Sequence, residues 1–292
     1  MQQDIFFSRF DKIKRNLAIV GLAISLTGCA TQPMKIAERA GYFANKTTTA
    51  VGQNERVRFL VMHYTALNDE QSLKELTQGN VSAHYLIPEE PAMKNGKPVV
   101  LQLVDENKRA WHAGVSSWNG RSNLNDSSIG IEIVNSGFTD DVNGQRTWYP
   151  FSEKQITAVA ALAKDIIHRY QITPDNVIGH ADIAPLRKQD PGKLFPWERL
   201  AAMGIGAWPD PIAVSQYLAG RAALEPAEVK NIQLLLKQYG YDQIPQHGIL
   251  DEATRKNIAA FQMHFRPTDI SGNADAETES IAYALIQQYR QT

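Results

Sequence analysis

The first folded region begins with the apolar run Val57-Arg58-Phe59-Leu60-Val61-Met62-His63. Branched and aromatic residues dominate this run, which predicts a strand, and its histidine stands where the strand gives way to a loop. Further strand-like stretches follow at residues 83–87, 99–104, 128–134 and 177–178. Since helical and turn-rich segments separate these stretches, the sequence predicts an α/β fold with a mixed central sheet flanked by helices.

A long amphipathic helix is predicted between the last two strands, over residues 153 to about 170. Apolar residues recur on one of its faces at helical spacing, and Ser152 with Gln155 has the pattern of a capping box. Residues 119–126 and 139–145 are polar and rich in turn-forming residues, so we predict surface loops there.

The sequence changes character after Trp208-Pro209-Asp210-Pro211. From there on, apolar residues recur at helical spacing and no stretch has a convincing strand pattern. We predict three helices in this part, which contain residues 229–239, 258–265 and 281–289. The chain is therefore divided into an α/β domain, residues 46–210, and a small all-α C-terminal domain, residues 211–292.

The composition is that of an ordinary globular protein. A chain of 292 residues suffices for two domains, and 43% hydrophobic with 21% charged residues argues against disorder and against a polytopic membrane protein. The net charge of -1 implies no broad basic surface, so nucleic acid is not an expected partner. Because Cys29 is the single cysteine, any zinc site has to use histidine and carboxylate.

The amino-terminal residues have the pattern of a secretory signal. Basic residues between positions 9 and 15 precede an apolar run over residues 17–26, which is shorter than the about 20 residues of a spanning helix. The run ends at Leu26-Thr27-Gly28-Cys29, which resembles the bacterial lipobox, where the cysteine becomes the first mature residue and carries the lipid. The alternative is a buried apolar helix that contains a cysteine.

We accordingly expect a lipoprotein signal peptide over residues 1–28 and a tether over residues 29–45, lipidated at Cys29. Position 30 is Ala rather than Asp, so the signal that retains lipoproteins in the inner membrane is missing. The expected location is the outer membrane, with the protein held by its lipid on the periplasmic face.

Four side chains at strand ends or inside a strand are candidates for chemistry: His63, Glu132, His180 and Asp190. Each has an ordinary alternative. A histidine at a strand end is commonly a surface or hydrogen-bonded core residue. Asp190 before Pro191 is typical of a turn, and Glu132 in an alternating strand points either to solvent or into a polar cleft.

Together these residue types suit metal-assisted hydrolysis. Two neutral imidazoles and one carboxylate make a three-ligand zinc site with an open fourth position. Such a metal acidifies water and polarises a carbonyl, Glu132 is suited to moving the proton, and Lys188 is suited to stabilising an oxyanion. Spacing alone does not establish that these distant residues meet.

Residues 56–208 resemble the amidase-2 family, which includes peptidoglycan amidases and peptidoglycan recognition proteins. The matching segments occur in the family's order: His63-Tyr64-Thr65, Ser82-Ala83-His84-Tyr85, Trp111-His112-Ala113-Gly114, Gly130-Ile131-Glu132, Gly179-His180 and Lys188-Gln189-Asp190-Pro191-Gly192.

The resemblance implies one Zn²⁺ per chain, bound by His63, His180 and Asp190, with Glu132 as catalytic acid and base and Lys188 as the residue that stabilises the oxyanion. It implies hydrolysis of the amide between N-acetylmuramic acid and L-alanine. The expected partners are peptidoglycan and muropeptides, anhydro forms included, and a monomer is expected.

Two more histidines in the matching segments have open roles. The resemblance places His84 in a structural strand near the cleft. Trp111 and His112 are candidate substrate contacts, because aromatic faces suit sugar rings; the alternative is a pair that closes the core.

The C-terminal part resembles a helical peptidoglycan-binding domain through Ile232-Gln233, Tyr239-Gly240-Tyr241, Gly248, Asp251 and Phe261-Gln262. The alternative is a bundle that supports the catalytic domain. For the whole chain, two rival functions stay open: a muropeptide receptor without activity, and a zinc peptidase that cuts within the stem peptide.

Overall fold

The structure is a computed structural model that describes residues 35–290, which fall into two units with the division between Gln53 and Asn54. In the first unit, β1 (Ile36–Glu38) and β2 (Phe43–Asn45) form an antiparallel hairpin within the segment predicted as a tether. The predicted signal peptide and Cys29 lie outside the described residues. None of the helices between residues 35 and 290 is long and apolar enough to cross a bilayer.

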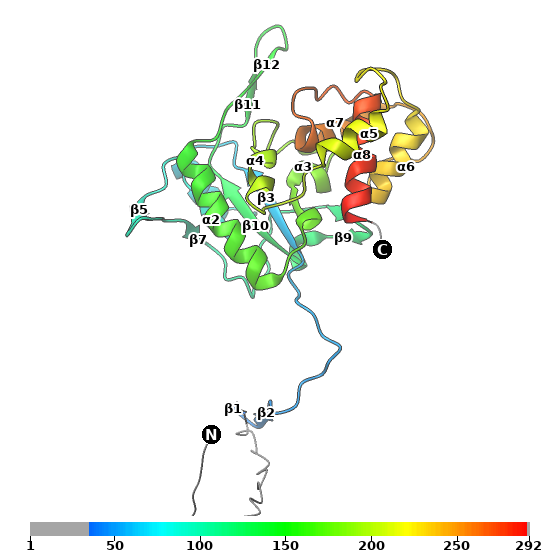
Figure 1. The fold of residues 1–292 in the computed structure, drawn as a ribbon. Helices are drawn as coiled ribbons and strands as arrows, with labels where there is room; N and C mark the ends of the chain where they lie inside the picture. Colours follow the sequence, from blue (N-terminus) through cyan, green and yellow to red (C-terminus); the bar gives the residue numbers. More distant parts are fainter. Residues whose placement is uncertain (1–34, 291–292) are drawn as a thin grey trace, which may run out of the picture. The chain divides into compact units, whose positions relative to one another are not determined.

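A mixed sheet forms the centre of the second unit, with strand order β13-β3-β10-β4-β7 (Figure 1). All neighbours in it run parallel except β7, which pairs antiparallel with β4 at one edge. The strands are β3 (Phe59–Tyr64), β4 (Tyr85–Ile87), β7 (Leu101–Gln102), β10 (Ser128–Ile133) and β13 (Val177–Gly179). The predicted α/β class with a mixed sheet is confirmed.

Helix α2 (Glu153–Tyr170) covers one face of this sheet, as Figure 1 shows. The helix has the predicted bounds, and the side chains of Ser152 and Gln155 form the predicted capping box. Its apolar stripe shares a buried cluster with Leu60 and Met62 of β3. The alternate residues Phe59 and Val61 belong to a different cluster, so the apolar run of β3 is explained by burial on both faces.

That second cluster joins the sheet to the C-terminal helices, so residues 54–292 share a continuous core. Trp118 stands edge-on to Tyr239 and Tyr241, at ring-centroid distances of 5.8 and 5.1 Å. Gly240 lies between the two tyrosines and is the C-cap of the helix that ends at Tyr239. A Cβ at Gly240 would lie 2.9 Å from the indole of Trp118. The predicted boundary after residue 210 therefore separates two kinds of secondary structure but not two packing units.

The predicted C-terminal helices correspond to α6 (Val229–Tyr239), α7 (Glu252–Phe265) and α8 (Ala276–Tyr289). The prediction of three helices in this part was wrong, because among the described residues a further helix, α5 (Pro211–Leu218), precedes them. Asp210 caps α5 by accepting from the Ile212 backbone N–H. Asp210 and Pro211, at the predicted boundary, are thus a helix start, since proline is well tolerated in the first helical turn.

Of the two predicted surface loops, residues 139–145 are exposed throughout, whereas residues 119–126 differ from the expectation. Residues 119–126 include the second strand of the β8–β9 pair and a short 3-10 helix, and Leu124 in that helix is fully buried. Residues 139–145 lie in the hairpin of β11 and β12, whose turn is exposed.

The remaining elements are β5 (Met93–Lys94), β6 (Lys97–Pro98), β8 (Ser117–Trp118), β9 (Arg121–Ser122), η1 (Leu124–Asp126), β11 (Phe138–Asp140), β12 (Arg146–Trp148), η2 (Pro174–Asn176), α1 (Asp69–Gln78), α3 (His180–Ile183) and α4 (Trp197–Ala202).

Candidate active site

Two of the candidate side chains come from neighbouring strands of the sheet. His63 of β3 and Glu132 of β10 are paired in the parallel register, so the backbone places them side by side. His63 Nδ1 lies 4.0 Å from Glu132 Oε1, and the glutamate side chain is 14% exposed. The interpretation of Glu132 as a solvated outward residue is therefore not supported.

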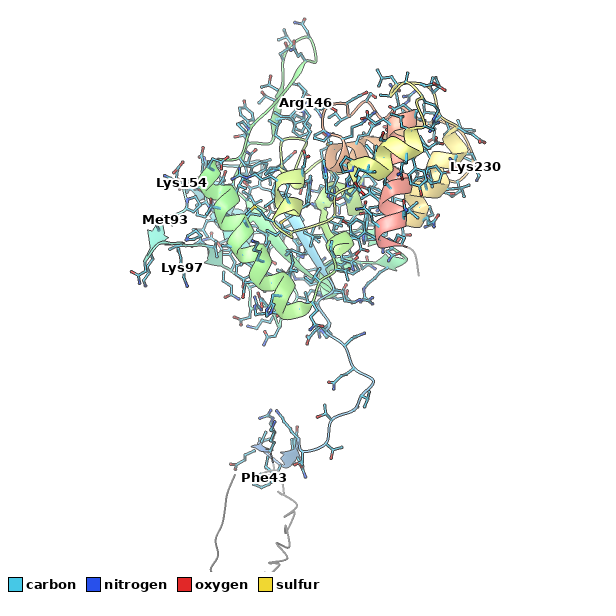
Figure 2. The ribbon with its side chains drawn as sticks, viewed as in Figure 1. Phe43, Met93, Lys97, Arg146, Lys154 and Lys230 are labelled. Carbon is cyan, nitrogen blue, oxygen red and sulfur yellow. The ribbon has the colours of Figure 1, made fainter. Side chains whose placement is uncertain are left out.

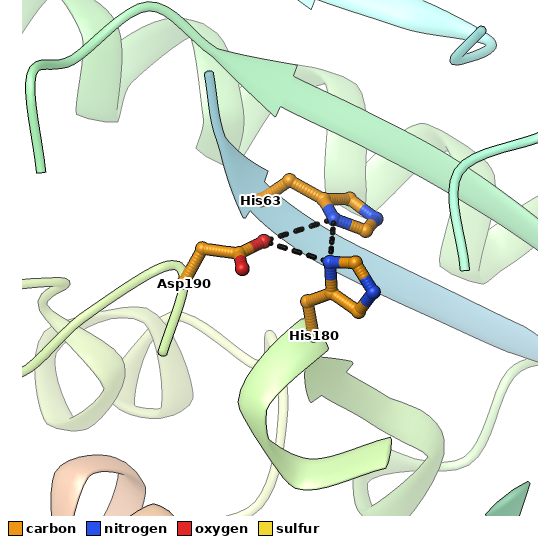
Figure 3. A group of neighbouring side chains, drawn as sticks. All are labelled: His63, His180 and Asp190. Atoms are coloured by element: carbon orange, nitrogen blue, oxygen red, sulfur yellow. Dashed lines mark hydrogen bonds and ion pairs between the residues drawn. The ribbon is translucent and has the colours of Figure 1, made fainter. Parts of the chain in front are cut away.

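The other two candidates come from the segment after β13. His180 is the first residue of α3, and Asp190 follows in a loop whose carbonyl accepts from the Ala181 N–H at 2.8 Å. The Nδ1 atoms of His63 and His180 and Oδ2 of Asp190 are all 3.0 Å apart (Figure 3). All three residues are buried and form a group suited to holding a metal ion.

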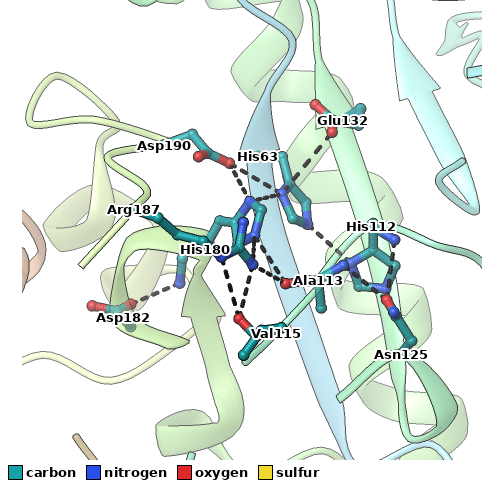
Figure 4. Close-up of polar contacts among 11 residues, drawn as sticks. His63, His112, Ala113, Val115, Asn125, Glu132, His180, Asp182, Arg187 and Asp190 are labelled. Carbon is teal, nitrogen blue, oxygen red and sulfur yellow. Dashed lines mark hydrogen bonds and ion pairs between the residues drawn. The ribbon is translucent and has the colours of Figure 1, made fainter. Parts of the chain in front are cut away.

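A metal ligand needs a nitrogen lone pair that points to the metal. The hydrogen bonds of the His63 and His180 rings show whether Nδ1 of each ring has one. The hydroxyl of Ser128 donates its proton to the Leu124 carbonyl at 2.7 Å. The hydroxyl oxygen of Ser128 is therefore the acceptor for His112 Nε2, at 3.1 Å. His112 Nδ1 then accepts from His63 Nε2 at 3.0 Å (Figure 4). His63 thus carries its proton on Nε2 and keeps a lone pair on Nδ1.

The same conclusion holds for the second ring. Nε2 of His180 lies 3.2 Å from the carbonyl oxygen of Ala113, which only accepts. The nearby Arg187 Nη2 directs its protons to the carbonyls of Ala113 and Val115, so His180 Nε2 is the donor. Two nitrogen lone pairs and a carboxylate oxygen therefore converge, and their spacing is close to the about 3.3 Å edge of a tetrahedral zinc site.

Electrostatics agree with this ligand set. Burial and the neighbouring His180 lower the pKa of His63 to about 4, so the ring is neutral at neutral pH, as a metal ligand must be. Burial, followed by the charge of Asp190, raises the pKa of Glu132 to about 8. Oε2 of Glu132 has no hydrogen-bond partner among the described residues, which leaves it open to a water or substrate atom.

His112 was predicted to contact substrate, and it lines the same cavity as Glu132 and His180, so that role stays a prediction. It is 7% exposed, and both of its ring nitrogens also take part in the hydrogen bonds described above. Gly130 makes room for it, since a Cβ at that position would overlap the imidazole. His112 therefore orients a candidate ligand, a role that the sequence did not indicate.

His84 has the structural role that the resemblance implied. Its Nδ1 accepts from the Gly130 N–H at 3.1 Å and its Nε2 faces the Lys108 carbonyl at 3.2 Å. Both ring nitrogens of His84, the residue directly before β4, are thus hydrogen-bonded to backbone groups of other segments.

A buried carboxylate beside the site was missed by the sequence analysis. Asp182 in α3 is 2% exposed and accepts from the Gly179 N–H at 2.7 Å, the Tyr241 hydroxyl at 2.5 Å and His264 Nδ1 at 2.7 Å. The His264 ring stacks on Trp197 at 3.8 Å between centroids. The helix that carries His180 is thus tied to α7 and to the turn after α6.

A cavity of about 160 Å³ opens beside the candidate metal site. Glu132, His180, Asp190 and Lys188 line its polar side, so the structure brings Lys188 to the place where the sequence predicted it. Trp111 is 52% exposed at the rim, and the Arg109 guanidinium stacks over its ring at 4.0 Å. The role of Trp111 as a substrate contact stays a prediction. The apolar wall consists of Leu67, Leu76 and Val81.

Two histidines, an aspartate and an adjacent glutamate that meet at one cleft are typical of metal-dependent hydrolases. Comparison with known proteins narrows this class. The family profile for N-acetylmuramoyl-L-alanine amidase matches residues 53–193, and the profile for a putative peptidoglycan binding domain matches residues 225–281.

Relatives extend the likeness over nearly the whole chain. The N-acetylmuramoyl-L-alanine amidase AmiD of Escherichia coli is 49% identical over 279 residues, which are 96% of this chain and 100% of that protein. The 1,6-anhydro-N-acetylmuramyl-L-alanine amidase AmpD of Haemophilus influenzae is 38% identical over 164 residues, which are 49% of this chain and 80% of that protein.

Solved structures give the same result. A complex of E. coli AmiD with anhydro-N-acetylmuramic acid-L-Ala-D-gamma-Glu-L-Lys has a TM-score of 0.84 at 50% identity, covering 88% of this chain and 99% of that one. AmpDh3 of Pseudomonas aeruginosa has a TM-score of 0.74 at 42% identity, covering 88% and 100%. The chain belongs to the amidase-2 family of N-acetylmuramoyl-L-alanine amidases.

Proposed function

We propose that this protein hydrolyses the amide between N-acetylmuramic acid and L-alanine in peptidoglycan and muropeptides, with one Zn²⁺ held by His63, His180 and Asp190. The observation that carries the proposal is the convergence of two lone-pair nitrogens and a carboxylate oxygen beside Glu132. The muropeptide bound to AmiD in its solved complex is the substrate that we propose for this chain.

In this mechanism zinc, when bound, supplies Lewis acidity toward water and the substrate carbonyl. Glu132 accepts a proton from the attacking water through its unpartnered Oε2 and delivers it to the leaving amine of L-alanine. The Lys188 ammonium, at the edge of the same cavity, stabilises the negative charge that develops on the carbonyl oxygen. The products are the sugar acid and a peptide with a free N-terminal L-alanine.

The test uses protein that lacks residues 1–29, incubated with purified peptidoglycan and with the anhydro muropeptide. New amino termini are identified with and without a chelator and after zinc is restored. We expect L-alanine termini from wild type with zinc and none from His180→Ala. His168→Ala, which changes an exposed histidine on α2, is the matched control and should behave as wild type.

Other products would point to the rival functions. Binding to the wall without new amines, in protein shown to contain zinc, would indicate a receptor. Termini other than L-alanine would indicate a peptidase that cuts within the stem peptide.

We also propose attachment to the outer membrane, facing the periplasm, through a lipid on Cys29. The support is the basic-then-apolar run and the segment Leu26-Thr27-Gly28-Cys29, with Ala at position 30. A fatty-acid analogue should label wild type and leave Cys29→Ser unlabelled, and the labelled protein should sediment with outer membranes. The monomeric state stays a prediction, which light scattering of the soluble form checks.

Murein binding by the helical region is supported by its match to the profile of putative peptidoglycan binding domains. The shared core and the contacts to Asp182 give that region a supporting role as well. We therefore propose that it serves both purposes, and pull-down of purified sacculi by the catalytically inactive Glu132→Gln protein tests the binding part.

A further inference from the structure

A second cavity, of about 410 Å³, lies between the β12 strand, the loop before Asp190 and helix α7. Four cationic side chains line it: Arg146, Arg187, Lys188 and Lys256. None of the described residues that line this cavity carries a carboxylate. We call it the basic groove, and it is built jointly by the amidase region and the helical region.

Hydrogen bonds hold two cations of the basic groove in place, and a third, Lys256, is paired with Glu252 on the same helix at 2.8 Å. The guanidinium of Arg146, labelled in Figure 2, donates to Gln189 Oε1 at 2.5 Å and is paired with Asp140 at 2.8 Å. Arg187 donates to backbone carbonyls, and within residues 35–290 it has no carboxylate within ion-pair distance. Fixed cations lose little conformational freedom when an anion binds between them.

The walls of the groove include apolar side chains, among them the buried Met263 and the partly buried Ile270. Half of the lining residues are charged or polar and half are apolar. A position at the junction of two regions and a volume of several hundred Å³ are typical of sites for small ligands. The groove therefore fits a short peptide that carries carboxylates better than a bare inorganic anion.

The groove adjoins the catalytic cavity. Lys188 lines both, and Asp190, two residues further along the chain, belongs to the candidate metal site. The two cavities thus lie on either side of one shared side chain, Lys188.

We propose that the basic groove binds the carboxylates of the stem peptide beyond the scissile amide. This inference rests on the proposed function. The γ-linkage of glutamate in L-Ala-D-γ-Glu-L-Lys leaves its α-carboxylate free, and the last residue adds a second carboxylate. Cations from two regions of the chain thus select for acidic stem peptides over amidated ones.

The test changes one charge on the protein and one charge on the substrate. Lys256 lies outside the catalytic machinery, on the exposed face of α7, so Lys256→Glu and Lys256→Ala are compared with Lys164→Glu, an exposed lysine on α2. Two anhydro muropeptides serve as substrates, one with the free glutamate α-carboxylate and one with that group amidated. Thermal melts establish that each variant is folded.

For the acidic substrate we expect Lys256→Glu to raise KM about 3- to 10-fold with kcat unchanged, and Lys256→Ala to raise it less. The amidated substrate should start from a higher KM in wild type and be insensitive to both changes. Lys164→Glu should alter neither substrate. Equal effects of Lys256→Glu on the two substrates, or no effect on either, would overturn the proposal.

Binding of the isolated tripeptides is measured by calorimetry in parallel, so that the groove is tested apart from turnover. If wild type cleaves neither muropeptide, the proposed function fails. The calorimetry then still decides the groove: weaker binding of the amidated peptide and of Lys256→Glu supports it, and identical binding throughout contradicts it.

Discussion

The candidate metal site has two halves that are built differently. His63 and Glu132 stand on adjacent parallel strands, and backbone hydrogen bonding sets their separation. His180 and Asp190 stand in the segment after β13, outside the sheet for most of its length. We call these the strand half and the loop half.

The two halves are also supported from different parts of the chain. The ring of His63 is oriented through His112 by groups that precede or belong to β10. The loop half is held through Asp182 by Tyr241 and His264, which follow it by 59 and 82 positions. A sheet fixes its side chains by its own register, whereas a loop needs partners from elsewhere in the fold.

The largest effect is expected for Glu132→Gln, which removes the proton acceptor from the strand half and keeps its volume. We expect kcat to fall about 10²- to 10⁴-fold with zinc content unchanged, because the amide neither accepts nor returns the proton. Steady-state kinetics and metal analysis measure this. Loss of the metal as well would show that Glu132 is a ligand, which would break the division of roles within the strand half.

The next largest effect concerns the orientation of His63. His112→Phe removes both ring hydrogen bonds, and we expect zinc affinity to fall about 10- to 100-fold in competition with a chelating dye. His112→Gln, which keeps an acceptor and donors, should recover part of the affinity. Unchanged affinity in both variants would mean that the sheet alone positions the strand half.

A moderate effect is expected when the support of the loop half is weakened. Tyr241→Phe removes one of the hydrogen bonds to the buried Asp182 carboxylate, which should lower the free energy of unfolding by about 1–3 kcal/mol. Denaturant melts measure it, with Tyr289→Phe, whose hydroxyl is 3.4 Å from its acceptor, as the control. Equal losses in the two variants would argue against a special role of Asp182.

The smallest effect is expected at Glu106, which belongs to neither half of the candidate metal site. Glu106 accepts from Arg169, Tyr85 and Tyr170, and chiefly the Arg169 hydrogen bonds lower its pKa from 4.5 to about 2. Because the folded pKa is the lower one, this stabilisation is present above pH about 4.5 and is lost as the pH falls through about 2.

Glu106→Gln should therefore lower the free energy of unfolding at pH 7 by about 1 kcal/mol or less, and by a smaller amount as the pH approaches 2. Melts across this pH range follow the difference. Zinc affinity at pH 7 should equal that of wild type; a drop would mean that support of the strand half extends through the sheet to α2.

The strand half was the more predictable one. The run ending in His63 and the strand with Glu132 were identified from local apolar patterns, and α2 from its capping box and stripe. These features depend on neighbours a few residues away. The convergence of His63 with His180 and Asp190, over 117 and 127 positions, required the family resemblance.

What the sequence did not reveal depends on long-range contacts or on polar residues that become buried. Helix α1 was missed because its residues are mostly polar, with Leu76 as its buried apolar anchor. Leu124 was assigned to a surface loop, although the neighbouring Asn125 bonds to the backbone of His112 and Ala113 and holds that loop inward. The partners of Asp182 carry no local signature at all.

The chain order of these contacts has a consequence for proteolytic cleavage. The partners that hold Asp182, Tyr241 and His264, follow it by 59 and 82 positions. A cut just after α5 (Pro211–Leu218) leaves all the candidate metal ligands on one fragment and both of these partners on the other. A protease that opens the chain there would therefore separate the loop half from its support without removing a single candidate ligand.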